Sequence, residues 1–338
     1  MLSNVFKYLR TDDWLDSKVP FMISVAVFSY LYNESNMSYL ETYAALGSYF
    51  LYVSMFLAFS YVINDFADME IDKKAGKQKV MFKLPKTVVV LSMIMIVLTG
   101  ILPMLFIVQE KIAFLAYTLF LYVTGAAYSV HWLLRFKERG LIGLIECSVA
   151  QRCLPLIPLI FLFTVNWIFF AIFIILSFIN GLRYILIHQA VDYENDIKTG
   201  VKTFVTEGHN KYRTAIITAF VMEGVLFTGV LIKLCSEHVY VIVIMVIYCV
   251  FEKIIATVVT KYMNVDLFCT FLAVPLEALY NVLFPVMTAL ILTISSGVYI
   301  GVFVFLAVLT FKCFKGKAAF ISVYAKSKTE KHRTSKER

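Results

Sequence analysis

The sequence predicts an all-α polytopic membrane protein. Of its 338 residues, 60% are hydrophobic and only 16% are charged, which leaves no room for a large soluble domain. Ten apolar runs follow one another along the chain, and most approach the roughly 20 residues that a helix needs to cross a bilayer core. Two clusters of aspartates stand where two of these runs end, and such clusters beside a membrane are candidates for a functional site.

Three regions are expected along the chain. Apolar residues at helical spacing in residues 1–18 predict an amphipathic segment that lies on the membrane surface. Residues 19–314 form the transmembrane domain, and the basic tail, 315–338, is expected to be disordered. The expected membrane helices are the apolar runs 19–32, 40–63, 87–108, 112–131, 141–163, 167–190, 213–232, 239–258, 268–292 and 297–314.

Lysines and arginines predict the orientation. Of the 31 basic residues, 27 fall in the N-terminus, in alternate loops and in the tail, and the opposite loops hold only Lys111 and Lys233. The remaining two, Arg152 and Arg183, lie inside apolar runs. The positive-inside rule therefore places both aspartate clusters and the tail on the cytoplasmic side. The expected location of this multi-pass protein is the cell membrane.

The first aspartate cluster follows the apolar run 40–63. At about 100° per residue, Asp65, Asp68 and Asp72 fall within an arc of roughly 60° on one helix face, while Glu70 points the opposite way. Carboxylates gathered in this way repel one another unless a cation lies between them. Mg²⁺ is the expected cofactor, because it binds one or two carboxylates and fills its other positions with phosphate oxygens and water.

The second cluster repeats the spacing of the first. Asp192, Asp196 and Gly200 share the Asp-x₃-Asp-x₃-Gly pattern that ends at Gly76 in the first cluster. Each glycine is expected to end its helix by adopting the left-handed conformation. Charged residues that merely follow a transmembrane helix are the alternative interpretation, but two copies with identical spacing at one membrane face favour a functional role.

Together the two clusters resemble the paired aspartate-rich motifs of the UbiA superfamily of intramembrane prenyltransferases, and the resemblance spans roughly residues 15–293. It implies a nine-helix bundle that opens to the cytoplasm, to which the run 297–314 would add a tenth helix. It also implies that the aspartates are catalytic and hold Mg²⁺, with an asparagine assisting. The residues that carry the resemblance are Asn64, Asp65, Asp68, Asp72, Asp192 and Asp196.

The resemblance implies Mg²⁺-dependent transfer of a prenyl group from an isoprenoid diphosphate to an acceptor within the membrane. Polarising the diphosphate breaks its C–O bond, and the acceptor then attacks C1 of the allylic cation. The expected partners are the isoprenoid diphosphate donor, an acceptor that the sequence does not name, and membrane lipids. No nucleic acid is expected as a partner.

Basic side chains near the clusters are candidates for binding the diphosphate. The loop that contains Tyr128, Arg135 and Lys137 resembles the second cytoplasmic loop of the family, where a tyrosine and a basic residue help to hold this group. The resemblance adds Lys77, after the first cluster, and Lys18, at the start of the first run. For each of these bases, a loop charge that only sets the orientation is the alternative.

Two further candidates lie inside apolar runs. Arg152 is some 16 Å below the cytoplasmic start of its helix, which is too deep for easy contact with a diphosphate at the aspartates. Its guanidinium needs an anion, either a glutamate or an anionic acceptor that it would position. His188, one turn before Asp192, would contact the diphosphate or a metal-bound water, or serve as a hydrogen-bonded core residue. The candidate glutamates are Glu146, Glu223 and Glu277.

Two other functions remain open at the level of sequence. A terpene cyclase of the same superfamily would use the same aspartates, with a double bond of the prenyl chain capturing the cation and no second substrate. A non-enzymatic transporter or channel would also carry intramembrane charges. Against the transporter, the paired acids stand at the cytoplasmic ends of helices and not at the bilayer midplane.

Overall fold

The computed structural model is helical, and no strand occurs among the residues that it describes. The chain divides into two compact units, Met1–Gly229 and Val230–Arg338. The expected helices at 239–258 and 268–292 lie partly outside the described residues, and the tail 315–338 lies wholly outside them. The described residues are 2–32, 37–74, 76–130, 134–199, 203–208, 211–248, 250 and 278–311.

The N-terminal segment folds into two short helices, α1 (Leu2–Tyr8) and α2 (Thr11–Trp14). Arg10, between them, has a φ of 52°, a left-handed conformation that turns the chain. The segment packs onto the first unit, since α2 contacts α4 (Tyr39–Ala67) and the Tyr8 hydroxyl hydrogen-bonds to Ser92. The interfacial location of residues 1–18 stays a prediction.

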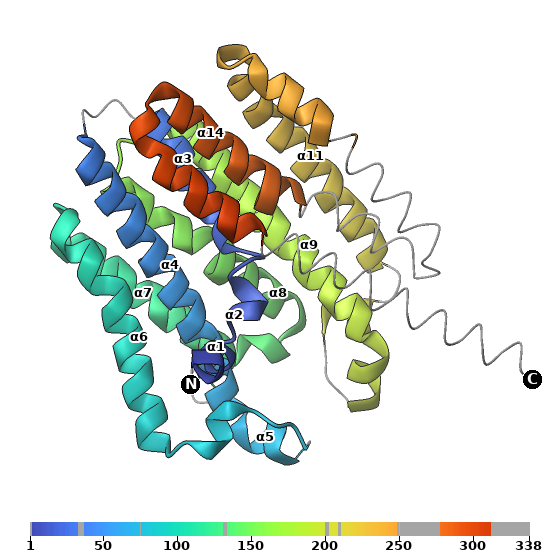
Figure 1. The fold of residues 1–338 in the computed structure, drawn as a ribbon. Coiled ribbons are helices and arrows are strands. Elements are labelled where there is room, and N and C mark those ends of the chain that lie inside the picture. The colour runs from blue at the N-terminus through green and yellow to red at the C-terminus, as the bar shows by residue number, and fades with distance from the viewer. Residues whose placement is uncertain are drawn as a thin grey trace, which may run out of the picture. The chain divides into compact units, whose positions relative to one another are not determined.

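The long helix α4 has a well-defined start and a buried face. The Ser38 hydroxyl accepts the Glu41 N–H, and the Glu41 carboxylate accepts the Ser38 N–H at 2.8 Å, which satisfies two backbone donors at the helix end. Tyr49, Tyr52 and Phe56 are fully buried along one side. In Figure 1, α4 lies beside α6 (Lys86–Ile107) and α7 (Lys111–Ser129), and both helices pack against it.

The first aspartate cluster lies where α4 ends. Our prediction of one continuous helix through Asp72 is wrong at one residue: α4 ends at Ala67, and Asp68 has a φ of −93° and a ψ of 4° before α5 (Met69–Lys74) begins. The predicted left-handed glycine is confirmed at Gly76, which has a φ of 74°. Gly200, for which the same was predicted, lies outside the described residues.

The expected helix at 141–163 changes its type twice. An α-helical part, α8 (Gly140–Ser148), is followed by a π-helical turn, η3 (Val149–Cys153), and then by a 3₁₀ part, η4 (Leu154–Phe161). Pro155 and Pro158 remove backbone donors from this stretch, which disrupts regular α-helical pairing. The Tyr49 hydroxyl donates to the Pro155 carbonyl at 3.0 Å and so ties η4 to α4.

The helix α9 (Trp167–Thr199) is long enough to extend beyond the membrane. Its 33 residues correspond to about 50 Å, against a hydrocarbon core of roughly 30 Å. Both α8 and η3 pack against it. The second aspartate cluster belongs to its last two turns. The remaining described elements are α3 (Val19–Leu31), η1 (Val80–Lys83), η2 (Phe136–Glu138), α10 (Phe204–Gly208), α11 (Lys211–Glu237), η5 (Leu279–Leu283), α14 (Phe284–Ser295), η6 (Gly297–Tyr299) and the helical stretches 240–248 and 300–311.

Six helices of the described chain are long and apolar enough to cross a membrane. Large apolar side chains cover their outer faces, as at Phe106 and Ile112, which are 87% and 86% exposed. Such surfaces suit lipid and not water. The count of nine or ten helices stays a prediction, because residues 251–277 lie outside the described part. The six helices are Tyr39–Ala67, Lys86–Ile107, Lys111–Ser129, Gly140–Phe161, Trp167–Val191 and Tyr212–Glu237.

Candidate active site

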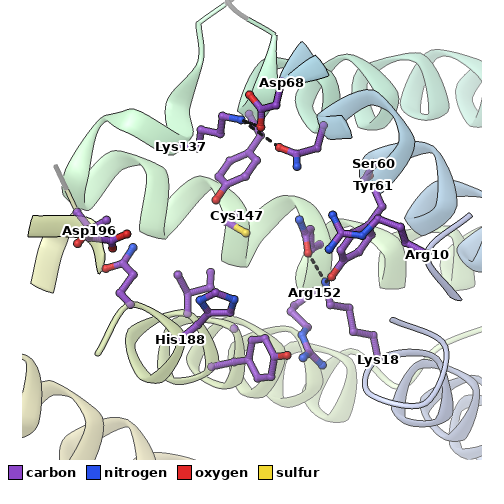
Figure 2. A pocket seen from close by; sticks show the side chains of 18 residues that line it. Arg10, Lys18, Ser60, Tyr61, Asp68, Lys137, Cys147, Arg152, His188 and Asp196 are labelled. Carbon is purple, nitrogen blue, oxygen red and sulfur yellow. Dashed lines mark hydrogen bonds and ion pairs between the residues drawn. The ribbon is translucent and has the colours of Figure 1, made fainter. Parts of the chain in front are cut away.

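A cavity of about 500 Å³ lies within the first unit. The end of α4, the helix α8 with its π-helical turn, and the second half of α9 contribute most of its wall, and Lys18, directly before α3 (Val19–Leu31), adds to it. Figure 2 shows the side chains that converge on it. The lining residues are Arg10, Lys18, Ser60, Tyr61, Asn64, Asp68, Tyr128, Lys137, Cys147, Gln151, Arg152, Gly181, Tyr184, Ile185, His188, Gln189, Asp196 and Thr203.

The first aspartate cluster meets basic side chains at this cavity. Lys137 forms an ion pair with Asp68, to which Arg135 adds a longer contact of 3.4 Å. Lys137 also donates to the Asn64 side-chain oxygen at 3.2 Å, and the Ser129 hydroxyl donates to the same oxygen at 2.8 Å. These contacts join the end of α4 to the loop after α7 and orient Asp68 and Asn64 at the cavity wall.

Asp65 and Asp72 are buried and lie outside the cavity lining. The Lys79 ammonium bridges them, at 2.6 Å from Asp65 and 2.5 Å from Asp72. Arg10 reaches Asp65 at 3.1 Å, and Lys77 reaches Asp72 at 2.8 Å. Burial alone would raise the pKa of Asp72, but hydrogen bonds from Lys77 and Lys79 outweigh it and hold this pKa below its ordinary value.

The second aspartate cluster reaches the same cavity from α9. Asp196 and His188 both line it, and in Figure 2 they lie apart from Asp68 and Lys137, across the cavity. The backbone of Asp192 belongs to α9, while its side chain lies outside the described part of the structure. Because α4 and α9 each end at a cluster, the negative ends of two helix dipoles add to the attraction for cations here.

The remaining candidates divide between the cavity and its surroundings. Tyr128, Lys18 and Arg152 line the cavity, whereas Arg135 and Lys77 do not. Sequence reasoning missed Arg10 and Lys79, as well as the lining residues Tyr61, Gln151 and Tyr184. The repeated aspartate spacing gave no signal for these residues, because none of them belongs to the repeated pattern: Tyr61 and Tyr184 precede the aspartates on α4 and α9, and the others lie on other segments. The predicted candidates that the structure brings together around the cavity are Lys18, Asn64, Asp68, Tyr128, Lys137, Arg152, His188 and Asp196.

The carboxylates around the cavity fit a hard divalent cation chemically. Asp68 and Asp196 enter one cavity from two helices and offer the anionic oxygens that Mg²⁺ prefers. Among the described residues, no group of three acidic, histidine or cysteine side chains is close enough together to hold a metal by itself. Two carboxylates suffice, however, where phosphate oxygens and water complete the coordination.

Lys79 is expected to hold the first cluster in place. Because a hydrogen bond to a charged group contributes about 1.5 kcal/mol, Lys79→Met should make amide hydrogen exchange in residues 64–84 roughly tenfold faster. Asp72 has a lowered folded pKa, so its share of this stabilisation is present above about pH 4 and disappears as the pH falls through the lowered value. Mass spectrometry of exchange measures the effect, with exposed Lys74→Met as the control. Equal exchange in both variants would contradict the bridging role.

Long apolar helices and a cavity that gathers carboxylates and bases define a class: an integral membrane protein with a polar site for a charged ligand. The family model described as the UbiA prenyltransferase family matches residues 21–273, which is most of the chain. The chain therefore belongs to the UbiA prenyltransferase family, and the predicted resemblance is confirmed. No match was found among curated proteins.

Solved structures with the same fold include a UbiA homolog from Archaeoglobus fulgidus bound to GPP and Mg²⁺. It is 18% identical, with a TM-score of 0.56, and the match covers 85% of this chain and 99% of the homolog. A structure of digeranylgeranylglyceryl phosphate synthase is 16% identical, with a TM-score of 0.59, over 85% of this chain and 98% of that one. At these identities, the likeness shows the fold alone.

Proposed function

We propose that this protein transfers a prenyl group from an isoprenoid diphosphate to an acceptor within the membrane, and that the transfer requires Mg²⁺. One observation carries the proposal: Asp68 and Asp196, from two separate motifs, line one cavity together with Lys137. Membership of the UbiA prenyltransferase family supports it. So do the solved structures of the Archaeoglobus fulgidus homolog, which is bound to GPP or DMAPP together with Mg²⁺.

The residues in and around the cavity have separate tasks in this proposal. Asp68, Asp196 and Asp192 would hold Mg²⁺. The buried Asp65 and Asp72, paired with Lys79, would stabilise the first cluster from outside the cavity. When bound, the metal neutralises charge on the diphosphate oxygens. Lys137 and Arg135, anchored at Asp68 and Asn64, bring positive charge to the leaving group, and Tyr128, Lys77 and His188 are the further candidates for binding it.

The reaction that this arrangement supports is ionisation followed by capture. The C1–O bond of the prenyl diphosphate breaks, and its electron pair leaves with the diphosphate. The acceptor then donates an electron pair to C1, which forms the new bond, and loses a proton. Lys137 and Arg135 stabilise the charge that develops on the departing oxygens, and such electrostatic stabilisation by groups already in place is often the largest contribution to catalysis.

The test is product identification. Purified protein is incubated with labelled geranyl diphosphate or longer prenyl diphosphates, with Mg²⁺ and extracted membrane lipids, and the labelled products are identified by mass spectrometry. A prenylated acceptor whose formation stops in EDTA is the expected result. A labelled hydrocarbon formed without added lipid would indicate a cyclase instead. Failure to consume any prenyl diphosphate would overturn the proposal.

The proposed orientation puts the cavity mouth on the cytoplasmic side of a cell membrane. Single cysteines placed in residues 64–86, 132–140 and 192–212 and in the C-terminal tail, on a cysteine-free background, should all be shielded from an impermeant thiol reagent in intact cells. Permeabilised cells provide the control, in which all of them should react. Labelling of the first or third of these loops from outside would contradict the proposed orientation. Labelling of the tail alone would contradict only the predicted tenth helix.

A further inference from the structure

Two buried cations face the cavity with no carboxylate partner among the described residues. Lys18 and Arg152 are 3% and 5% exposed, and both line the cavity. Lys18 donates to the Tyr61 hydroxyl at 3.1 Å and to the Gln151 side-chain oxygen. Arg152 donates to the Ser17 carbonyl at 3.2 Å. In the described chain, neither cation lies within ion-pair distance of an acidic side chain, although buried charges are normally paired.

The Arg152 guanidinium has a hydrogen-bond donor that no described residue uses. Its guanidinium lies 5.4 Å from the centre of the Tyr184 ring, and its Nη2 atom is buried with no hydrogen-bond partner among the described residues. Among the described residues the expected glutamate partner is not found: Glu223 pairs instead with Arg183, and neither carboxylate oxygen of Glu146 has a hydrogen-bond partner. Glu277, the third candidate, lies outside the described residues. A buried guanidinium donor that is left over in this way is suited to an anionic ligand.

The local backbone conformation supports a ligand site at Arg152. Arg152 and Gln151 belong to the π-helical turn η3, and although they are neighbours in sequence, both line the cavity. Turns of this kind often occur at functional sites. Across from it, Gly181 leaves room for the arginine stem, because a Cβ atom there would be only 3.2 Å from the Arg152 Cγ atom and 2.9 Å from the Ser148 Cβ atom.

We propose that Lys18 and Arg152 form a subsite for an oxyanion, a carboxylate or a phosphate monoester, at the head of the acceptor. Figure 2 shows these two side chains close together, across the cavity from Asp68 and Lys137. The diphosphate is thereby assigned to one side of the cavity and the acceptor's anion to the other. The assignment to an acceptor rests on the proposed prenyl transfer, whereas the oxyanion site itself does not.

The experiment measures anion binding without prenyl transfer. Full-length protein in detergent with EDTA, at pH 6, is titrated with phenyl phosphate, benzoate or uncharged benzyl alcohol, and the apparent Kd is taken from the rise in Tm. Wild type should be stabilised by one or both anions and not by the alcohol, and the better anion identifies the head group. Lys18→Met and Arg152→Met should each weaken binding at least tenfold, as expected for loss of a charge-assisted hydrogen bond.

Charge-conserving and matched variants make the result decisive. Lys18→Arg and Arg152→Lys should bind the anion within a few-fold of wild type, and they replace the methionine variants if either of those fails to fold. Lys137→Met removes a cation from the other side of the cavity, so it should weaken geranyl diphosphate binding and leave the anion Kd within twofold. Anion binding that is unchanged in Lys18→Met and Arg152→Met, absent from wild type, or equally reduced in Lys137→Met would overturn the subsite.

A pH series gives a second readout. Burial and the neighbouring Arg152 charge lower the pKa of Lys18 to about 7, so this side chain is charged at pH 6 and largely neutral at pH 8. Benzoate keeps its charge over this range, and its Kd should rise several-fold in wild type but not in Lys18→Arg. The other charged or titratable groups near Lys18 are Arg10, Asp13, Tyr61, Cys147, Tyr184 and His188. A pH effect that persists in Lys18→Arg would belong to one of these groups and would contradict the role of Lys18.

The two proposals fail separately. Loss of anion binding in the Lys18 and Arg152 variants, together with no consumption of prenyl diphosphate by wild type, would reject the proposed function and retain an oxyanion site. Prenyl transfer in wild type with unchanged anion binding in these variants would reject the subsite alone.

Discussion

Asp68→Asn should reduce prenyl transfer by about 10²–10³-fold, the loss typical of removing one group that stabilises developing charge. Asp68 lies at the cavity wall, where Lys137 and Arg135 hold its carboxylate. An amide keeps the size of the side chain but lacks the anionic oxygen that Mg²⁺ prefers. Initial rates of labelled product formation measure the loss, and EDTA should reduce wild-type activity to a similar extent. Asp192→Asn is expected to behave in the same way.

Glu70→Gln is the matched control for this substitution. Glu70 belongs to α5, two residues beyond Asp68, but its side chain is exposed and does not line the cavity. Its activity should therefore stay within twofold of wild type. Equal losses in Glu70→Gln and Asp68→Asn would show that the first cluster is oriented differently. A wild-type rate in Asp68→Asn would remove Asp68 from the site.

The convergence of the two motifs was predictable because it depends on patterns that the sequence displays. Apolar run lengths and the lysine and arginine distribution predict that the runs before Asp68 and Asp196 cross the membrane in the same direction. The ends of α4 and α9 are then expected on one face, and both aspartates do line one cavity. The prediction that a glycine ends the helix in the left-handed conformation also depended on a local pattern, and Gly76 has this conformation.

The rest of the site depends on tertiary packing that no local pattern shows. Arg10 reaches Asp65, 55 residues away, because a left-handed turn between α1 and α2 places its side chain there. The place of Gln151 in the cavity wall was also not predicted. The apolar run 141–163 was expected to form one regular helix, and no local pattern indicated the π-helical turn in which Gln151 and Arg152 lie.

The Arg183–Glu223 ion pair should dominate the response of stability to mutation. It joins α9 to α11 at 2.8 Å, and its two side chains are 1% and 0% exposed. Arg183→Met leaves a buried carboxylate without its counter-ion, which is expected to cost about 3–5 kcal/mol of unfolding free energy. Neither residue lines the cavity, so the loss should appear in stability before it appears in ligand binding. Unfolding by a denaturing detergent measures the change.

The double variant Arg183→Met/Glu223→Leu separates loss of the pair from loss of packing. Because a buried ion pair gains little over well-packed apolar side chains, the double variant should recover most of the lost stability. Lys233→Met is the contrast: its pair with Glu237 is about one-third exposed on each side and joins neighbouring turns of one helix, so removal should change stability by less than about 1 kcal/mol. If the double variant were no more stable than Arg183→Met, side-chain packing between α9 and α11, and not neutralisation of the buried charge, would account for the loss of stability.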